Sequence, residues 1–247
     1  ARWIGNEKGI AGETNWALLD TAGSKRGEGG PSQAVLNQGN SSGRHYIPGE
    51  ADVSIRPGWF YHTKDDDKVK TGEELFDLYL KSVGRNANFL LNVPPDQRGL
   101  FHEKDSASLI EFKKIKDAFF KNNQAESALV HVESSRNGYS PQAINDGKRE
   151  THWAPGSDKS EWNISFDLIK PVIVKAVQLQ EYIELGQRIS SFTIEVSDNG
   201  KDYSAVAEAT TIGYKRIITF NPVKTRYVRI NILESKAVPV IAEIGIF

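Results

Sequence analysis

The chain has 247 residues, enough for two domains of modest size, and 31 basic against 32 acidic side chains leave a net charge of -1. No block of Lys and Arg interrupts it, which argues against a nucleic-acid partner, and its apolar runs are far too short to span a bilayer. Because Cys is absent, disulfides, thiolate metal sites and cysteine nucleophiles are excluded.

The first half of the chain has the pattern of an α/β domain. Apolar side chains recur at helical spacing over residues 71–83 and again over residues 106–120. Between these segments, residues 88–93 form a short apolar run with the length and hydrophobicity of a strand buried on both faces. A helix–strand–helix succession is typical of an α/β barrel or a doubly wound sheet. We therefore predict that residues 1–124 are the end of an α/β domain.

The second half changes to an all-β pattern after the polar residues 121–126. Turns are predicted at Asp198-Asn199-Gly200, where Gly supplies a positive φ, and at Asn221-Pro222, where Pro cannot continue a strand ladder. Strands at this spacing predict an all-β jelly-roll or β-sandwich domain, which we place at residues 129–247. The predicted strands cover residues 172–179, 192–196, 217–220, 227–232 and 241–247.

Four segments of the first half carry chemically distinctive residues: 2–7, 48–61, 83–86 and 91–96. The second of these combines carboxylates, a guanidinium group, a Pro-Gly bend and three aromatic side chains. Such a loop is too rich in rigid and polar groups to be a mere connector. It suits a sugar site, because carboxylates and Arg bind hydroxyl groups while Trp packs on the apolar face of a pyranose ring.

Together the four segments resemble glycoside hydrolase family 29, the α-L-fucosidases, and in particular its subfamily acting on α-1,3/1,4-linked branches. The family's "Arg-Trp-x-Gly-Asn-Glu" segment corresponds to residues 2–7, which implies that Glu7 is the general acid/base. The resemblance also implies a TIM-like α/β barrel, of which this chain holds the C-terminal portion. The nucleophile is then an aspartate upstream of Ala1, which we treat as an internal position, and the two carboxylates act by retaining double displacement.

Competing interpretations exist for Glu7 in the first segment and for Glu50 and Arg56 in the second. Outside its motif, Glu7 would be read as a solvated carboxylate, and Glu50 is its rival as proton donor. Glu50 could instead bind a neighbouring sugar hydroxyl. Arg56 is expected to form a structural ion pair with Asp52 that holds the loop or, alternatively, to contact the sugar directly.

The remaining polar and aromatic residues also have alternative roles. Trp59 could be a core residue or an aromatic wall for the C6 methyl group of fucose. Arg2 resembles the arginine that family members direct at the sugar or at the nucleophile. Bracing of the barrel rim is expected for Arg85, Asn86 and Asn92. The histidines of the first half do not have the spacing of metal ligands. We expect surface or supporting roles for His45, His62 and His102.

The second half resembles the F5/8 type C, or discoidin, domain, which overlaps in fold with family 32 carbohydrate-binding modules. Many relatives bind a structural Ca²⁺, and their ligands correspond here to Asp146, Thr151 and Glu243. Lys148 and Arg149 depart from the usual pattern, and their charges would lower the affinity for Ca²⁺. The core is expected to contain Trp153, Trp162, Phe166 and Leu168. The resemblance is carried by residues 139–147, 151–153, 162–168, 197–203, 226–230 and 242–244.

Two classes of function remain open. One is a retaining exo-α-L-fucosidase that hydrolyses terminal α-1,3/1,4-linked fucose and needs no cofactor for catalysis; the other is a non-catalytic carbohydrate-binding or adhesion protein. The first 120 residues favour the enzyme, because a binding protein has no need for the acid/base segment. An inactive family member, without its nucleophile, is a third reading. The expected partners are fucosylated glycans of Lewis type or similar, and the expected location is periplasmic or extracellular.

Overall fold

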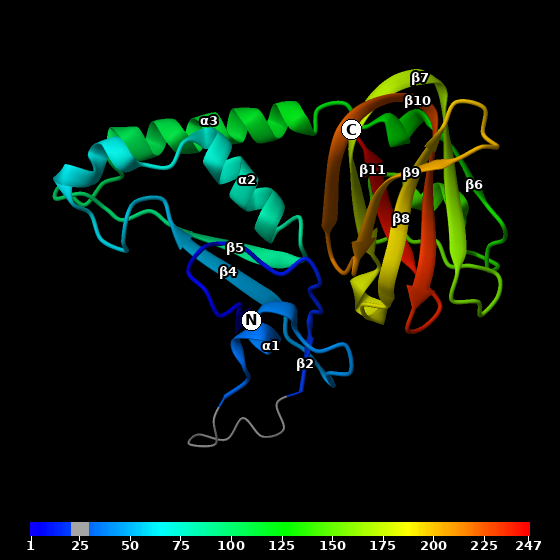
Figure 1. The fold of residues 1–247 in the computed structure, drawn as a ribbon, viewed down its shortest axis with the longest axis horizontal. Helices are drawn as coiled ribbons and strands as arrows, with labels where there is room; N and C mark the ends of the chain where they lie inside the picture. The colour runs from blue at the N-terminus through cyan, green and yellow to red at the C-terminus, as the bar shows by residue number, and fades with distance from the viewer. Residues whose placement is uncertain (21–29) are drawn as a thin grey trace. The chain divides into compact units, whose positions relative to one another are not determined.

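The computed structural model describes residues 1–20 and 30–247, which form two compact units, Ala1–Lys121 and Asn122–Phe247 (Figure 1). Each unit has hydrophobic clusters of its own. The division falls within the polar stretch at which the sequence pattern changes from α/β to all-β. No helix within the described ranges is both long and apolar enough to cross a membrane.

The first unit is built on a parallel sheet of three strands in the order β1-β4-β5, which are Arg2–Trp3, Gly49–Ser54 and Ala87–Asn92. A separate antiparallel pair joins β2 (Leu18–Leu19) to β3 (His45–Tyr46). The α/β barrel expected from the sequence is therefore present in this chain only in part.

Helix α2 (Gly72–Ser82) links β4 to β5 and packs on one face of their sheet. It begins at a capping box, in which the Thr71 hydroxyl accepts from the Glu74 N–H and the Glu74 carboxylate accepts from the Thr71 N–H. Leu75 and Leu78 pack with Val53 of β4 and with apolar side chains of α3 (Glu103–Phe119). The other helical elements of this unit are α1 (Gln33–Gln38) and the 3-10 helix η1 (Thr63–Lys68).

Strand β5 differs from its prediction on one face. Phe89 and Leu91 pack with the cluster beneath α2, but Leu90, on the opposite face, is 50% exposed. The prediction of burial on both faces is therefore wrong for this structure, because Asn88 and Leu90, on the face turned away from α2, are exposed.

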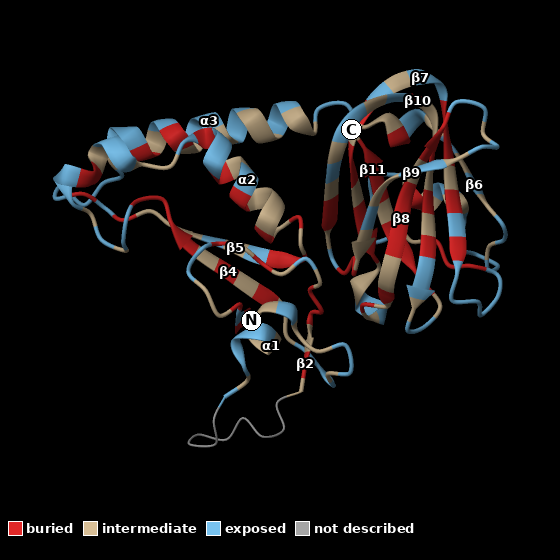
Figure 2. Cartoon of the chain, viewed as in Figure 1, coloured by how far each residue is buried: buried red, intermediate tan, exposed pale blue. Residues whose placement is uncertain are grey.

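The second unit is a six-stranded antiparallel sheet that curls around one core (Figure 1). Its strand order is β11-β7-β10-β8-β9, and β6 pairs with β7. Buried residues, red in Figure 2, recur along the strands of the curled sheet, and the core expected around Trp153, Trp162, Phe166 and Leu168 is confirmed. The strands are β6 (Leu129–Val132), β7 (Trp162–Glu181), β8 (Ile189–Ser197), β9 (Ser204–Thr210), β10 (Arg216–Ser235) and β11 (Ile241–Ile246).

The two longest strands correct one predicted turn. Gly200, at φ 71°, lies between β8 and β9 and confirms the turn at 198–200. Asn221-Pro222, by contrast, lies inside β10, where the pairing with β7 shifts between Thr219 and Val223. A bulge tolerates Pro because the missing N–H is not needed there. Residues 217–220 and 227–232 are therefore parts of one strand.

Candidate active site

The three parallel strands of the first unit end at one edge of their sheet, which we call the carboxyl edge. Glu7 follows β1, Trp59 follows β4, and Asn92 is the last residue of β5. Enzymes built on parallel α/β sheets hold their catalytic groups at this edge, because loops from several strands meet there. The topology thus brings together three segments that are far apart in the sequence.

Glu7 is presented by a compact loop. The Ile4 N–H donates to the Glu50 carbonyl and the Gly9 N–H to the Asp52 carbonyl, so the loop follows β4 on both sides of its tip. Gly9 has φ 70°, and a Cβ there would lie 2.8 Å from Val53 Cγ1, so the close approach requires glycine. The main chain is thereby held near β4 while the side chain of Glu7 stays exposed.

A hydrogen bond joins two of the predicted site residues. Trp59 Nε1 donates to Glu7 Oε2 at 2.9 Å. The Trp59 carbonyl accepts from Asn92 Nδ2 at 3.0 Å, and the same amide donates to the Ser54 hydroxyl at 3.0 Å. Asn92 therefore ties the end of β5 to the end of β4 and to the loop that carries the indole.

A second indole meets a second carboxylate on the face of the sheet turned away from α2. Trp3 Nε1 donates to Asp52 Oδ1 at 2.7 Å. Glu50 pairs with Trp3 on one side and with Asn88 on the other, which places it further from the carboxyl edge than Asp52. The structure thus separates the two candidate acids: Glu7 lies in the loop at the carboxyl edge, and Glu50 lies within the strand.

Arg2 does not face this site. Its side chain is 4% exposed and donates to the carbonyl oxygens of Leu36, Trp16 and Ile47 and to Asn15 Oδ1. Burial lowers the pKa of Arg2 to about 10, so the guanidinium stays charged at neutral pH. The prediction of a substrate contact is wrong, because β1 turns Trp3 outward and the adjacent Arg2 inward.

The brace expected from Arg85 and Asn86 lies at the opposite edge of the sheet. Arg85 Nη1 donates to the Ala11 carbonyl at 2.9 Å, and Asn86 Nδ2 donates to the Asn15 carbonyl at 3.3 Å. Asn15 in turn donates to the carbonyls of Arg85 and Asn86. This network connects to Arg2 and stabilises the amino ends of the strands.

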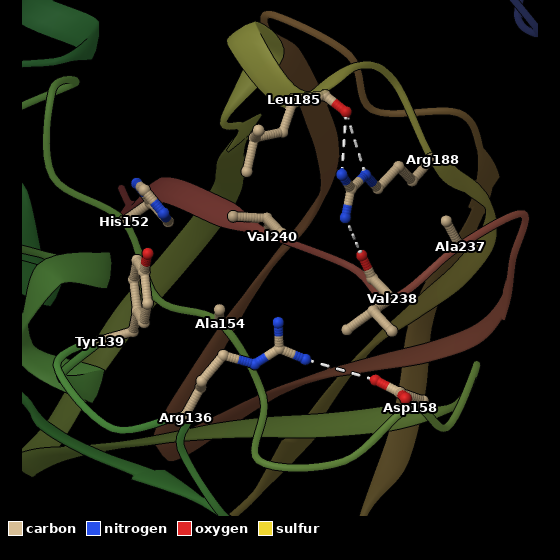
Figure 3. A pocket seen from close by; sticks show the side chains of 10 residues that line it. All are labelled: Arg136, Tyr139, His152, Ala154, Asp158, Leu185, Arg188, Ala237, Val238 and Val240. Carbon is tan, nitrogen blue, oxygen red and sulfur yellow. Dashed lines mark hydrogen bonds and ion pairs between the residues drawn. The ribbon is translucent and has the colours of Figure 1, made fainter.

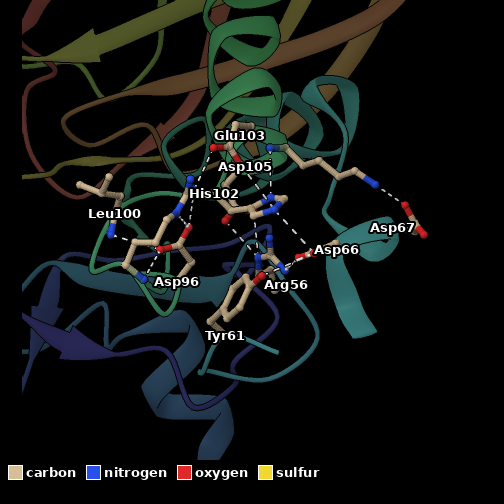
Figure 4. Close-up of polar contacts among 11 residues, drawn as sticks. Arg56, Tyr61, Asp66, Asp67, Asp96, Leu100, His102, Glu103 and Asp105 are labelled. Atoms are coloured by element: carbon tan, nitrogen blue, oxygen red, sulfur yellow. Dashed lines mark hydrogen bonds and ion pairs between the residues drawn. The ribbon is translucent and has the colours of Figure 1, made fainter. Parts of the chain in front are cut away.

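Arg56 is the centre of a buried cluster beside the loop that carries Trp59 (Figure 4). It is 1% exposed, its Nε lies 2.9 Å from Asp105 Oδ1, and its Nη1 lies 2.8 Å from Asp66 Oδ1. The predicted ion pair with Asp52 is wrong, since Asp52 accepts from Trp3 instead. A direct contact with sugar is also contradicted, because the guanidinium has no exposed surface.

The partners of Arg56 escape sequence reasoning. Asp66 lies in η1 and Asp105 in the first turn of α3, both outside the four segments. A fully buried aspartate in the first turn of a helix looks, in sequence, like an ordinary N-terminal charge. Only the tertiary structure shows that it neutralises an arginine.

The second unit has a cavity of about 260 Å³ at its surface (Figure 3). One wall is aromatic: Tyr139 lies with its ring 4.9 Å from that of His152, and burial lowers the pKa of this histidine. The opposite side carries two guanidinium groups, of which Arg136 pairs with Asp158 at 3.3 Å and Arg188 holds the carbonyls of Leu185 and Val238. An aromatic wall facing hydrogen-bonding groups is a combination that fits a sugar ring.

Oxygen atoms crowd together where the resemblance implies a Ca²⁺ site. The Thr151 hydroxyl lies 2.8–2.9 Å from both carboxylate oxygens of Asp146 and from the Lys148 carbonyl. One hydroxyl hydrogen cannot satisfy three acceptors at once, so the remaining oxygen acceptors are left to solvent or to a hard cation. Glu243 lies beside it, accepting from the Gly147 N–H at 3.1 Å.

The charges around the oxygen cluster also bear on that fit. Burial, and secondarily the charge of Asp146, raises the pKa of Glu243 to about 7. The Arg149 guanidinium turns to Glu150, at 3.1 Å, and to the Tyr214 hydroxyl. In the part of the chain that the structure describes, no three His, Cys, Asp or Glu side chains form a metal-binding group. The cluster would thus rely on hydroxyl and carbonyl oxygens besides two carboxylates.

Comparison with known proteins gives two family matches. Residues 12–115 match the model of the α-L-fucosidase family, and residues 124–244 match the F5/8 type C domain. Glu7 lies just upstream of the first match. α-L-Fucosidase 1 of Arabidopsis thaliana is 36% identical over 252 residues, which cover all of this chain and 49% of that protein. The chain thus spans about half the length of this curated relative.

A solved structure gives the same assignment. A Ruminococcus gnavus fucosidase of glycoside hydrolase family 29, determined in complex with fucose, has a TM-score of 0.88 and 35% identity. The match covers 100% of this chain and 50% of that protein. Residues 12–115 thus belong to the α-L-fucosidase family, and residues 124–244 form an F5/8 type C domain.

Proposed function

We propose that this chain is part of a retaining exo-α-L-fucosidase that removes terminal α-1,3/1,4-linked fucose from glycans, with Glu7 as general acid/base. An aspartate from the part of the protein preceding this chain attacks the anomeric carbon, the glycosidic C–O bond breaks, and Glu7 gives its proton to the leaving oxygen. Water then attacks the fucosyl-enzyme, Glu7 takes a proton from it, and the aspartate leaves.

The observation that carries this proposal is the position of Glu7. It is an exposed carboxylate at the carboxyl edge, on a loop held against β4, with its Oε2 occupied by the indole of Trp59. Glu50, within its strand, lies further from the loops that would surround a substrate. The family to which residues 12–115 belong supports the reaction class, and the solved relative bound to fucose supports the sugar.

The experiment that tests Glu7 uses Glu7→Ala in the full-length protein. Cleavage of a natural fucosyl glycan should fall roughly 10²- to 10⁴-fold, because its poor leaving group needs a proton. An aryl fucoside whose leaving group departs unaided should form the fucosyl-enzyme readily, so that breakdown of this intermediate becomes the slow step. Azide, which needs no general base, should then restore turnover and yield α-fucosyl azide, the product of net retention.

The matched control is Glu50→Ala, which removes the rival carboxylate of the same protein. It should show neither the dependence on leaving group nor the rescue by azide. If Glu50→Ala shows both and Glu7→Ala shows neither, the acid/base is Glu50 and our assignment is wrong. An inactive family member would instead show no fucosyl transfer in the unaltered protein.

Two roles are proposed for the F5/8 type C domain. Carbohydrate binding is the alternative function of the chain, and the cavity lined by Tyr139, His152 and Arg136 supports it. A structural Ca²⁺ held by Asp146, Thr151, Glu243 and the Lys148 carbonyl would bridge two segments distant in the sequence, and the surplus of oxygen acceptors supports it. Neither role conflicts with hydrolysis by the other domain.

A further inference from the structure

The Glu7 carboxylate has one hydrogen-bond partner among the described residues, the indole N–H of Trp59. We infer that Trp59 is a positioning residue that sets the orientation of the Glu7 carboxyl group, and that Asn92 and Arg56 position Trp59 in turn. The inference rests on the proposed role of Glu7 as acid/base. It gives the indole a role distinct from an aromatic wall for the sugar.

The contact decides which oxygen of Glu7 exchanges the proton. Oε2 accepts the indole N–H at 2.9 Å, so in the neutral acid the proton resides on Oε1. Oε1 is then the oxygen that gives a proton to the leaving group and later takes one from water.

The segment that carries Trp59 is anchored at both ends. Residues 57–60 form an arch between Arg56 and Tyr61, and the Arg56 guanidinium lies 4.7 Å from the centroid of the Tyr61 ring. Both ends also meet Asp66: Arg56 Nη1 donates to Oδ1 at 2.8 Å, and the Tyr61 hydroxyl donates to Oδ2 at 3.5 Å. The arch therefore has its two ends fixed to one buried cluster (Figure 4).

A third anchor holds the arch near its middle. Asn92 Nδ2 donates to the Trp59 carbonyl at 3.0 Å, so the main chain of Trp59 is tied directly to the end of β5. The exposed Glu7 side chain, free to change rotamer in solution, thus meets an indole whose backbone is fixed on three sides. A rigid donor of this kind lowers the cost of orienting the acid before reaction.

The test is Trp59→Phe in the full-length protein, since Phe keeps an aromatic ring and lacks only the N–H donor. For a fucoside with a poor leaving group we expect kcat to fall about tenfold. This is near the lower end of the loss expected when a hydrogen bond to a charged group is removed, because the contact is exposed. KM should stay close to its original value. Cleavage of an aryl fucoside with a good leaving group should change much less, because that leaving group needs no proton from Glu7.

Two comparisons separate positioning from a merely structural effect. Asn92→Ala should show the same pattern with a smaller fall in kcat. The Trp59→Phe/Asn92→Ala double variant should lose less activity than the two single losses combined, because both substitutions act on one contact. Trp3→Phe removes an indole donor that binds Asp52, so it should leave the leaving-group dependence as it is. An equal loss for good and poor leaving groups in Trp59→Phe would overturn the inference.

A spectroscopic measurement makes the inference independent of the reaction. The indole ¹H–¹⁵N resonance of Trp59, assigned by its loss in Trp59→Phe, should move in Glu7→Gln, because a neutral amide oxygen accepts the N–H less strongly than a carboxylate. A resonance that ignores Glu7→Gln overturns the positioning role even if Glu7 is the acid/base. Conversely, a Glu7→Ala enzyme without leaving-group dependence overturns the proposed function, while the change of the Trp59 resonance in Glu7→Gln still reports the contact.

Discussion

Glu243 provides a pH-dependent prediction at the scale of one residue. Burial raises the pKa of Glu243 to about 7 in the folded protein, against an ordinary value of 4.5. A carboxyl group with a raised folded pKa contributes stability below its unfolded pKa and loses that contribution as pH rises through the folded value. In a protein of residues 122–247 without Ca²⁺, the Glu243 contribution to the free energy of unfolding should therefore be lost between about pH 4.5 and 7.

Glu243→Gln isolates this contribution. Glu181, whose pKa is also raised to about 7 by burial, remains in both proteins, so only the difference between them reports Glu243. Ca²⁺ binds the ionised carboxylate, so the Ca²⁺-induced rise in Tm should be larger at pH 8 than at pH 5.5 and absent in the variant. At ten times Kd the gain is about 1.4 kcal/mol. No rise at about 10 mM Ca²⁺ at either pH would exclude the metal site.

At this scale the sequence shows which chemical groups each segment carries, but it predicts poorly the direction in which the side chains point. Arg2 and Trp3 are neighbours in one motif, yet one enters the interior and the other the open face of the sheet. The partner of Trp59 lies in the loop after β1, and the partners of Arg56 lie in η1 and α3. Contacts between such distant segments follow from tertiary packing, which a single sequence does not display.

Strand β7 contains a local strain that yields a prediction at the scale of one element. Asp167 pairs with Tyr227 and Val172 with Thr225, so the residues between them bulge out of the ladder. Within this bulge Ile169 has φ 70°, a left-handed conformation that costs a non-glycine residue roughly 1–2 kcal/mol. Asp167 Oδ1 accepts the Ile169 N–H at 2.8 Å and holds the bend in place.

Ile169→Gly should therefore stabilise the second unit. Relief of the strain outweighs the entropy that glycine adds to the unfolded chain, for a net gain of roughly 0.5–1 kcal/mol. The Ile169 side chain is 51% exposed, so little packing is lost. Urea unfolding of residues 122–247 provides the measurement.

The control for this prediction is Ile173→Gly on the same strand. Ile173 is 69% exposed and has no positive φ, so glycine there should lower the stability by up to about 1 kcal/mol. If both variants destabilise equally, the backbone at Ile169 is not strained. If Ile169→Gly alone destabilises, its side chain contributes more packing than its exposure indicates.

The elements best predicted from the sequence are those whose local signals agree. Helix α2 combines helical periodicity with the capping box of Thr71 and Glu74, and it begins and ends within a residue of its prediction. Strand β9 is absent from the prediction, because its residues, Ser-Ala-Val-Ala-Glu-Ala-Thr, include three alanines, no aromatic side chain and only two β-branched ones, Val206 and Thr210. Asn221-Pro222 conceals the continuity of β10, because a bulge and a turn use the same residues.

On the scale of the whole molecule, the sequence shows the change of architecture but not how far each unit reaches. The predicted second domain begins at residue 129, whereas the structure divides the chain after Lys121. The difference lies in the 3-10 helix η2 (Gln124–Ser127), whose Ala125 is fully buried in the core of the second unit. A polar segment of this composition reads as a linker, since Ala125 is the one buried residue among the four of η2.

The last prediction follows from η2 and concerns independent folding. Asn123 Oδ1 accepts the Ile246 N–H at 2.9 Å, and Asn145 Nδ2 donates to the Ala125 carbonyl at 2.6 Å. With about 1 kcal/mol for each hydrogen bond and a similar amount for the buried methyl group, η2 should stabilise the unit by roughly 2–3 kcal/mol. A protein of residues 122–247 should therefore unfold cooperatively, and one of residues 129–247 should melt roughly 10 °C lower. Asn123→Ala in the longer protein, which removes one acceptor and keeps η2, should lie between the two. Equal melting temperatures would place the boundary at residue 129, and a featureless melt of the longer protein would show that the second unit does not fold alone.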